Sequence, residues 1–225
     1  MAIARALVAL ALVVTACAAP SPEPAARLGR AIAAMEALAG LRFELRATVV
    51  ASGAASPITT EARMVGEYQA PDRLHVTVFQ DGARTDLVLV ERRTYVDTGS
   101  GYRQSVRVPV GPLRDARAPI TFLRGGGAAS FAGLGFARGS VTYRVRLDLS
   151  AGDLAARSFE GRSVPPDAKG TVEVEIGLFD DLVRRQTVEI VSSAEGAGSG
   201  LDRVRTAYTV EYWAHGERVE VGEPE

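Results

Sequence analysis

Hydrophobic and polar side chains alternate with a period of two over most of this chain. That period places successive side chains on opposite faces of an extended strand, so each such stretch predicts a strand with one buried face. Turn signals at 70–72, 81–82 and 97–101 separate neighbouring stretches and predict hairpins that run in a meander. The predicted strands are 41–49, 58–68, 73–80, 84–90, 94–97, 102–108, 141–149, 171–178, 182–192 and 204–213.

One longer stretch near the N-terminus has helical periodicity instead. Leu28, Ile32 and Met35 recur at the spacing that brings side chains onto one face of a helix. We therefore expect an amphipathic helix over 24–39, and Gly40 is the residue expected to stop it.

Two short helices and one glycine-rich segment complete the pattern. A short helix is predicted over 119–124, which contains a proline near its start and precedes three glycines. Another is predicted to end at about Phe159, because Ser150 and Asp153 have the spacing of a capping box. Residues 131–136 are apolar but too rich in glycine to predict a firm strand or helix, which favours a lid over the rest of the fold.

The balance of these elements predicts a mainly β (α+β) protein. About eight to ten strands each present an apolar face, while one helix and two short ones are present to cover them. The sheet would have to pack on a second sheet, close into a barrel, or curl around the helices and leave a hollow. Inward positions are mostly Val, Leu and Ala with few aromatic residues, which favours a cavity.

The N-terminus carries an export signal that ends on the only cysteine of the chain. The apolar run 6–14 is too short to span a bilayer and has the length of a signal-peptide hydrophobic region. Residues 14–17 read Val-Thr-Ala-Cys and resemble a bacterial lipobox, in which Cys17 receives the lipid. An ordinary signal cleaved after Ala18 is the alternative. The predicted organisation is a signal peptide over 1–16, a flexible tether over 17–25 and a single domain over 26–225.

Several short motifs in this order resemble the half-barrel lipoproteins related to the LolA and LolB carriers. The resemblance is nearest to the mycobacterial LppX and LprG type and covers most of residues 26 to 222. It implies a single, strongly curved antiparallel sheet wrapped around helices, with an apolar cavity that holds acyl chains or other lipids. The motifs that carry it are residues 66–73, 94–96, 101–102, 208–213, 215–216 and 219–221.

Inward-facing residues of the predicted strands, and two residues of the short helix 119–124, are the expected lining of this cavity. The same pattern is also that of an ordinary hydrophobic core, and the two interpretations partly coincide in a curved sheet. The predicted lining residues are Phe43, Leu45, Phe122, Leu123, Tyr143, Val145, Leu147, Val174, Ile176, Val188, Ile190 and Tyr208.

Composition and candidate chemistry point away from catalysis. The formal net charge of −1 argues against a nucleic-acid partner. His75 and His215 have no Cys, His or carboxylate neighbour at metal-ligand spacing, so neither a metal nor a cofactor is expected. The glycine clusters match neither a dinucleotide-binding nor a phosphate-binding loop.

The function expected from the sequence is therefore binding rather than chemistry. The leading hypothesis is a monomeric lipoprotein, exported and anchored through Cys17 to the outer face of the cytoplasmic membrane, or to the outer membrane or periplasm where the organism has one. It would bind a lipid or another apolar ligand as a non-catalytic carrier or acceptor. The alternative is a structural, sensor or assembly lipoprotein whose core is filled by its own side chains and which binds a protein partner of the cell envelope.

Overall fold

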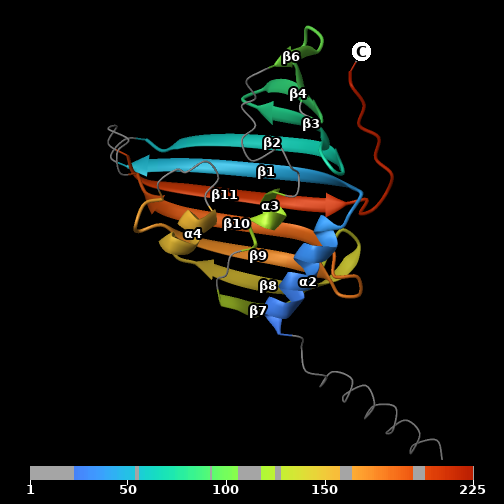
Figure 1. Cartoon of the computed structure of the whole chain (residues 1–225). Coiled ribbons are helices and arrows are strands. Elements are labelled where there is room, and N and C mark those ends of the chain that lie inside the picture. The colour runs from blue at the N-terminus through green and yellow to red at the C-terminus, as the bar shows by residue number, and fades with distance from the viewer. Residues whose placement is uncertain are drawn as a thin grey trace, which may run out of the picture.

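The computed structural model describes residues 23–53, 56–91, 93–105, 118–124, 128–157, 164–194 and 201–224. In these residues, eleven strands form one antiparallel sheet (Figure 1). The sheet is not closed, because β6 and β7 lie at its two edges and do not pair with each other. The strands are β1 (Gly40–Gly53), β2 (Ile58–Gln69), β3 (Arg73–Gln80), β4 (Ala83–Val90), β5 (Arg93–Asp97), β6 (Arg103–Ser105), β7 (Ala128–Ala137), β8 (Ser140–Leu149), β9 (Lys169–Gly177), β10 (Val183–Ser193) and β11 (Leu201–Trp213).

The strand order shows how two meanders make this sheet. It runs β6-β5-β4-β3-β2-β1-β11-β10-β9-β8-β7, so the chain moves outward from β1 to one edge and then inward from the other edge to β11. Pairing of β1 with β11 joins the two halves, with Phe43 opposite Tyr212 and Leu45 opposite Val210. Consecutive strands pair as hairpins because short turns permit only antiparallel neighbours. The predicted mainly β, half-barrel architecture is confirmed.

Three helices lie on one face of the sheet, which we call the inner face (Figure 1). They are α2 (Pro24–Glu36), α3 (Ala118–Thr121) and α4 (Ala151–Arg157). Among the described elements, α2 contacts β7, β10 and α3, while α4 contacts β8 and β9. The helices therefore cover mainly the half of the sheet that contains β7 to β10.

The N-terminal helix is amphipathic as predicted, but it is shorter. Its apolar stripe buries Leu28, Ala31 and Met35, and Glu36 is its last residue. Gly40 does not stop the helix, because it is the first residue of β1. A Cβ atom at Gly40 would lie 2.8 Å from the carbonyl oxygen of Glu217, so this glycine lets the C-terminal segment approach the strand.

The short helices lie where the sequence pattern predicts them, but α3 ends at Thr121 and not at 124, and the predicted end at Phe159 lies outside the described residues. The predicted capping box is present at α4, where Ser150 Oγ accepts from the Asp153 amide at 3.2 Å and Asp153 Oδ2 accepts from the Ser150 amide at 2.9 Å. Arg157, in the last turn of α4, donates from Nε to the carbonyl oxygen of Phe122 at 2.8 Å. This bond ties α4 to the turn that follows α3.

The glycine-rich segment 131–136 is part of strand β7, which the sequence did not predict. A bulge interrupts the pairing with β8 between Phe131 and Leu134, and Gly133 lies there with φ of +99°. A Cβ atom at Gly135 would come within 2.9 Å of Thr142 Oγ1, so only glycine fits without a shift. The segment is an edge strand of the sheet and not a loop over the inner face.

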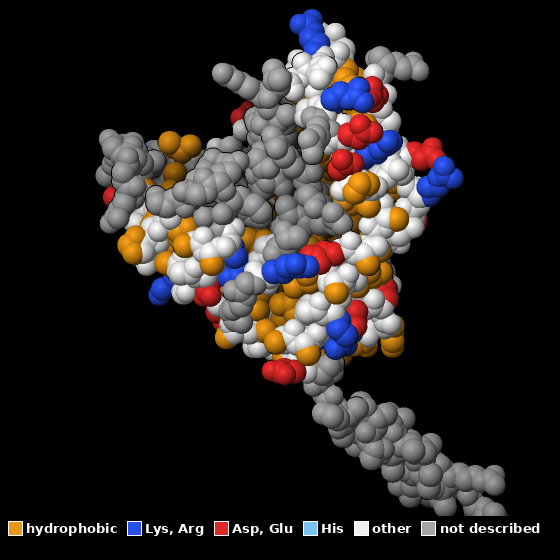
Figure 2. Space-filling model, viewed as in Figure 1, with side chains coloured by type: hydrophobic (Ala, Val, Ile, Leu, Met, Phe, Trp, Pro, Cys, Tyr) orange, Lys and Arg blue, Asp and Glu red, His pale blue; other side chains and the backbone are white. Residues whose placement is uncertain are grey.

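The hydrophobic core lies on the inner face, and apolar side chains of the three helices pack into part of it. Its largest fully buried side chains include Tyr68, Tyr212 and Phe43. Hydrophobic side chains gather over β7 to β9 beside α2 on this side of the molecule (Figure 2). A separate small cluster joins Val88 of β4 to Val221 of the C-terminal segment, on the outer face of the sheet.

The outer face is polar and carries ion pairs between neighbouring strands. Arg185 pairs with Glu175 at 2.9 Å on one side and with Glu211 at 2.8 Å on the other. Arg205 pairs with Glu189 at 2.9 Å. These contacts confirm a charged, solvent-facing exterior for this part of the sheet.

His215 joins the end of β11 to the start of β10 and gives the stability a pH dependence. Its Nε2 lies 2.9 Å from the carbonyl oxygen of Val183, and its Nδ1 lies 3.1 Å from Arg184 Nη1. A neutral ring, protonated on Nε2, satisfies both contacts. Burial and the positive charge of Arg184 lower the pKa of His215. They outweigh the hydrogen bond to Val183, which raises it, so the pKa lies below its ordinary 6.5.

The unfolded chain therefore binds more protons than the folded one as pH falls below 6.5. We expect the free energy of unfolding to be highest above that pH and to decline as the pH falls below it. Urea denaturation of His215→Gln, which keeps a donor for Val183, should show a flatter pH profile over this range. An equally steep profile in the variant would assign the dependence to other groups.

Candidate functional site

The residues predicted to line a cavity all come together on the inner face, in one apolar cluster. They lie on β1, β8, β9, β10, β11 and the turn after α3, although up to 165 positions separate them along the chain. Their role as ligand contacts remains a prediction. The fully covered members are Phe43, Leu123, Tyr143, Val145, Leu147, Val174, Ile176 and Val188.

Burial on the inner face decreases along the strands toward one end, as from Leu41 and Phe43 to Leu45 on β1. Leu45, Ile190 and Tyr208 are only partly buried, and they pack against the core together with Met64 and Val78. We call these five residues the half-covered region. Neighbours in the sheet register link them, because Leu45 lies opposite Met64 and Met64 lies opposite Val78. The phenol of Tyr208 is more buried than the residue as a whole, and this burial raises its pKa above the ordinary value.

A glutamine interrupts the apolar surface. Gln186 of β10 has no exposed area and lies between Val174 of β9 and Val210 of β11. Neither its amide nitrogen nor its amide oxygen has a hydrogen-bond partner. An unsatisfied buried amide costs about 1–3 kcal/mol, so a native protein that retains one needs a reason for it. Our sequence reasoning missed this residue, although its even spacing from Val188 and Ile190 indicates the inner face.

A buried arginine fastens α2 to the sheet. Arg27 Nη2 donates to the carbonyl oxygens of Gly177 at 2.9 Å and Leu178 at 2.7 Å, and it lies 3.0 Å from Asp181 Oδ1. Its guanidinium also lies 5.0 Å from the ring centroid of Tyr143. No local pattern in the sequence predicts this contact, because the partners lie about 150 positions further along the chain.

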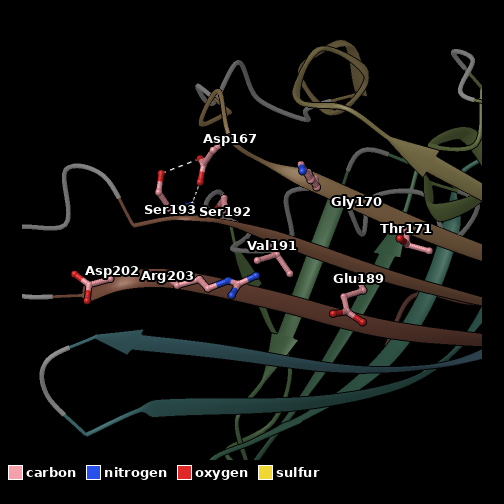
Figure 3. Close-up of a pocket in the computed structure, with 10 residues that line it drawn as sticks. Asp167, Gly170, Thr171, Glu189, Val191, Ser192, Ser193, Asp202 and Arg203 are labelled. Carbon is pink, nitrogen blue, oxygen red and sulfur yellow. Dashed lines mark hydrogen bonds between the residues drawn. The ribbon is translucent and has the colours of Figure 1, made fainter.

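Two pockets lie on the outer face, and none of the predicted lining residues contributes to them. The first, of about 550 Å³, is at the ends of β9, β10 and β11 (Figure 3). Its walls include Thr171, Glu189 and Arg203, and Asp167 accepts hydrogen bonds from the backbone and side chain of Ser193, both at 2.9 Å. The second, of about 480 Å³, lies on β1 to β3. Charged side chains contribute to both, Glu189 and Arg203 to the first and Glu61 and Arg63 to the second.

Within the described part of the chain, no group of three or more His, Cys, Asp or Glu side chains is placed to hold a metal ion. The same residues contain no helix with the length and apolar character needed to cross a membrane. Cys17 lies outside the described residues.

No model of a known protein family matches the sequence, and no curated protein matches it. Solved structures do match. The lipoprotein LppX from Mycobacterium tuberculosis aligns with 90% of this chain and 100% of its own, at a TM-score of 0.56 and 13% identity. LprF from Mycobacterium bovis aligns with 91% of this chain and 98% of its own, at a TM-score of 0.57 and 12% identity.

The chain has an LppX-like fold. The structural comparison confirms the resemblance seen in the sequence motifs, and it extends over nearly the whole described chain. A LolA superfamily protein from Nitrosomonas europaea also aligns, over 89% of this chain, with a TM-score of 0.29 and 9% identity. At these identities the LppX-like comparison establishes the fold, and function has to be argued from the inner face.

Proposed function

We propose that this chain is an exported lipoprotein, anchored to a membrane through a lipidated Cys17, that binds a lipid or another apolar ligand on its inner face. It acts as a monomeric, non-catalytic carrier or acceptor outside the cytoplasm. The observation that carries the proposal is the apolar inner face itself, which is buried over most of its length and only half-covered around Leu45, Ile190 and Tyr208.

The physical basis is burial of hydrocarbon. Each methylene group removed from water contributes about 0.8 kcal/mol, so an acyl chain laid on the half-covered region is held without specific polar contacts. The membrane affinity of the lipid anchor depends on buried hydrocarbon in the same way. A single acyl chain binds a membrane only marginally, whereas two chains on Cys17, as lipoproteins generally carry, hold it stably.

Gln186 refines the class of ligand. Its buried amide has one acceptor and two donor hydrogens without partners, and it lies on the apolar inner face. Because this position has no exposed area, an ester, amide or hydroxyl group of a ligand would satisfy the amide only if its hydrocarbon entered the packed region between Val174 and Val210. We therefore propose an acyl ester or acyl amide rather than a plain hydrocarbon.

Gln186→Met tests this role, because methionine is apolar and of similar volume. We expect the ligand-free protein to gain about 1–3 kcal/mol of unfolding free energy, since an unsatisfied amide is removed. Affinity for an acyl ester should fall roughly 2- to 10-fold, the equivalent of one net hydrogen bond. Gln80→Met, at an exposed position of β3, is the matched control and should change neither quantity. A loss of stability in Gln186→Met would show that the amide is satisfied in solution.

Uptake of a fluorescent fatty acid tests the function as a whole. The chain from Ala18 onward should bind it saturably, and an unlabelled acyl ester should displace it. Absence of any uptake would overturn the carrier proposal and favour the structural, sensor or assembly alternative, in which the core is filled by the protein's own side chains.

A further inference from the structure

Exposed hydrophobic side chains are concentrated at one corner of the molecule. Of the eight large hydrophobic residues that are exposed in the described part of the chain, five lie on β7, at the start of β8 and in the turn between β9 and β10. We call this set the β7 rim. Its members, with their exposed fractions, are Phe131 (47%), Leu134 (58%), Phe136 (67%), Val141 (42%) and Phe179 (92%).

Contacts between these elements make the rim one surface. In the register of β7 with β8, Phe136 lies opposite Val141, and Leu134 lies opposite the buried Tyr143. The rings of Phe131 and Tyr143 have centroids 4.7 Å apart. The amide of Leu178, the residue before Phe179, donates to the carbonyl oxygen of Val141 at 3.0 Å. The rim thus continues the apolar inner face to the open edge of the sheet.

The N-terminal helix begins at the same corner. In its first turns, Arg27 donates to the carbonyl oxygen of Leu178 at 2.7 Å, and Arg30 pairs with Asp181 at 2.8 Å. Cys17 precedes Pro24 by only seven residues, which reach at most about 25 Å when fully extended. A lipid on Cys17 would therefore hold this corner, and not the opposite edge of the sheet, next to the bilayer.

We infer that the β7 rim is a membrane-docking surface, whose apolar side chains enter the interface of the bilayer that holds Cys17. The inference rests on the proposed lipid anchor. Because the anchor confines the domain to the membrane surface, weak apolar contact is enough to orient it. Docking through the rim would place the apolar inner face in continuity with the lipid from which a ligand comes.

A second copy of the chain fits the rim less well than a bilayer does. The bulge between Phe131 and Leu134 breaks the regular ladder that another edge strand would need. Phe179 projects from a turn, where strand pairing would leave it uncovered. Nearby charges are already paired within the chain, Arg30 with Asp181 and Arg184 with Asp180, so an apolar surface is the better match.

The experiment uses the mature chain from Cys17, coupled through its only thiol to maleimide lipid in phosphatidylcholine vesicles. Trp213 is the only tryptophan, so Phe179→Trp combined with Trp213→Phe gives a single fluorescent reporter in the rim. The control combines Ile58→Trp with Trp213→Phe. Ile58 is also an exposed apolar residue, at 60%, but it lies at the opposite end of the strands.

We expect lipids brominated on their acyl chains to quench the rim reporter and to shift its emission to the blue, while the control at position 58 retains its emission. Adding Phe136→Asp should abolish the quenching, and circular dichroism would check that this variant is folded. Equal emission from both reporters, with or without dimerisation of the chain through β7, would overturn the inference. Maleimide coupling supplies the anchor chemically, so this outcome is distinct from a failure of Cys17 acylation or of ligand uptake.

Discussion

Val145→Asp is expected to abolish cooperative folding at neutral pH. Val145 has no exposed area and lies on the inner face between Phe131 of β7 and Val174 of β9. A carboxyl group there, without a partner, shifts its pKa upward by up to 3–5 units, so it folds in its protonated form at a cost of up to about 4 kcal/mol at neutral pH, and burial of the unpaired neutral carboxyl adds about 1–3 kcal/mol. That penalty is comparable to the whole stability of a typical domain, about 5–15 kcal/mol. Circular dichroism and urea titration would detect the loss, and acid should partly restore the fold.

Val141→Asp is the matched control, because it changes the same residue type on the same strand at a position that is 42% exposed. We expect this variant to unfold at nearly the wild-type urea concentration. Comparison of the two variants also distinguishes a packed core from a hollow at β8. If Val145→Asp folded normally and lost only lipid binding, the inner face at β8 would be open to a ligand, and the core assigned to it here would be wrong.

Arg27→Met is expected to lower the free energy of unfolding by on the order of 3 kcal/mol, because hydrogen bonds from a charged donor are lost. The guanidinium is the contact that joins the first turns of α2 to two carbonyl oxygens and a carboxylate in the turn between β9 and β10. Its side chain is only 7% exposed, so water cannot replace these bonds. Hydrogen exchange should show that α2 amides lose protection more than those of β1 or β11.

Arg30→Met provides the comparison within the same helix. Arg30 pairs with the same carboxylate, Asp181, but its side chain is 51% exposed. An exposed pair contributes about 0–1 kcal/mol, so this variant should lie within that range of the wild type. Equal losses from the two substitutions would mean that helix position, and not burial of the guanidinium, determines the effect.

The fold was largely predictable because strand alternation is a local property of the sequence. Residues 41–49 and 141–149 show which side chains face inward without any knowledge of their neighbours, and the structure places both stretches in strands with the expected inner face. The capping box of Ser150 and Asp153 is equally local and was found for the same reason. Features that depend on three or four adjacent residues are visible in one sequence.

The features that were missed depend on distant partners. Strand β7 tolerates its glycines because Gly135 packs beneath Thr142 of β8, a contact that the segment alone does not reveal. In the sequence, Arg27 is an ordinary polar position of a helix. Only the folded structure brings the carbonyl oxygen of Gly177 against it. The decrease in burial along the strands toward Leu45 and Tyr208 likewise depends on what packs over the inner face, which alternation within strands does not specify.

The proposed activities of this chain would then follow from one continuous surface. The inner face begins at the exposed rim of β7, passes through the packed region at Tyr143 and Val145, and reaches the half-covered region around Tyr208. The N-terminal helix starts beside the rim, so an anchor at Cys17 and a membrane-facing rim are mutually consistent. Ligand binding and membrane docking have separate tests, so a negative result for one does not decide the other.

Native mass spectrometry of the chain from Ala18 onward, purified without detergent from an expression host, tests the central claim most directly. We predict a population heavier than the polypeptide by the mass of a bound lipid, released on activation as a species that contains an acyl ester or amide. A single lipid-free mass that persists after incubation with acyl esters and fatty acids would contradict the proposal that the inner face binds lipid.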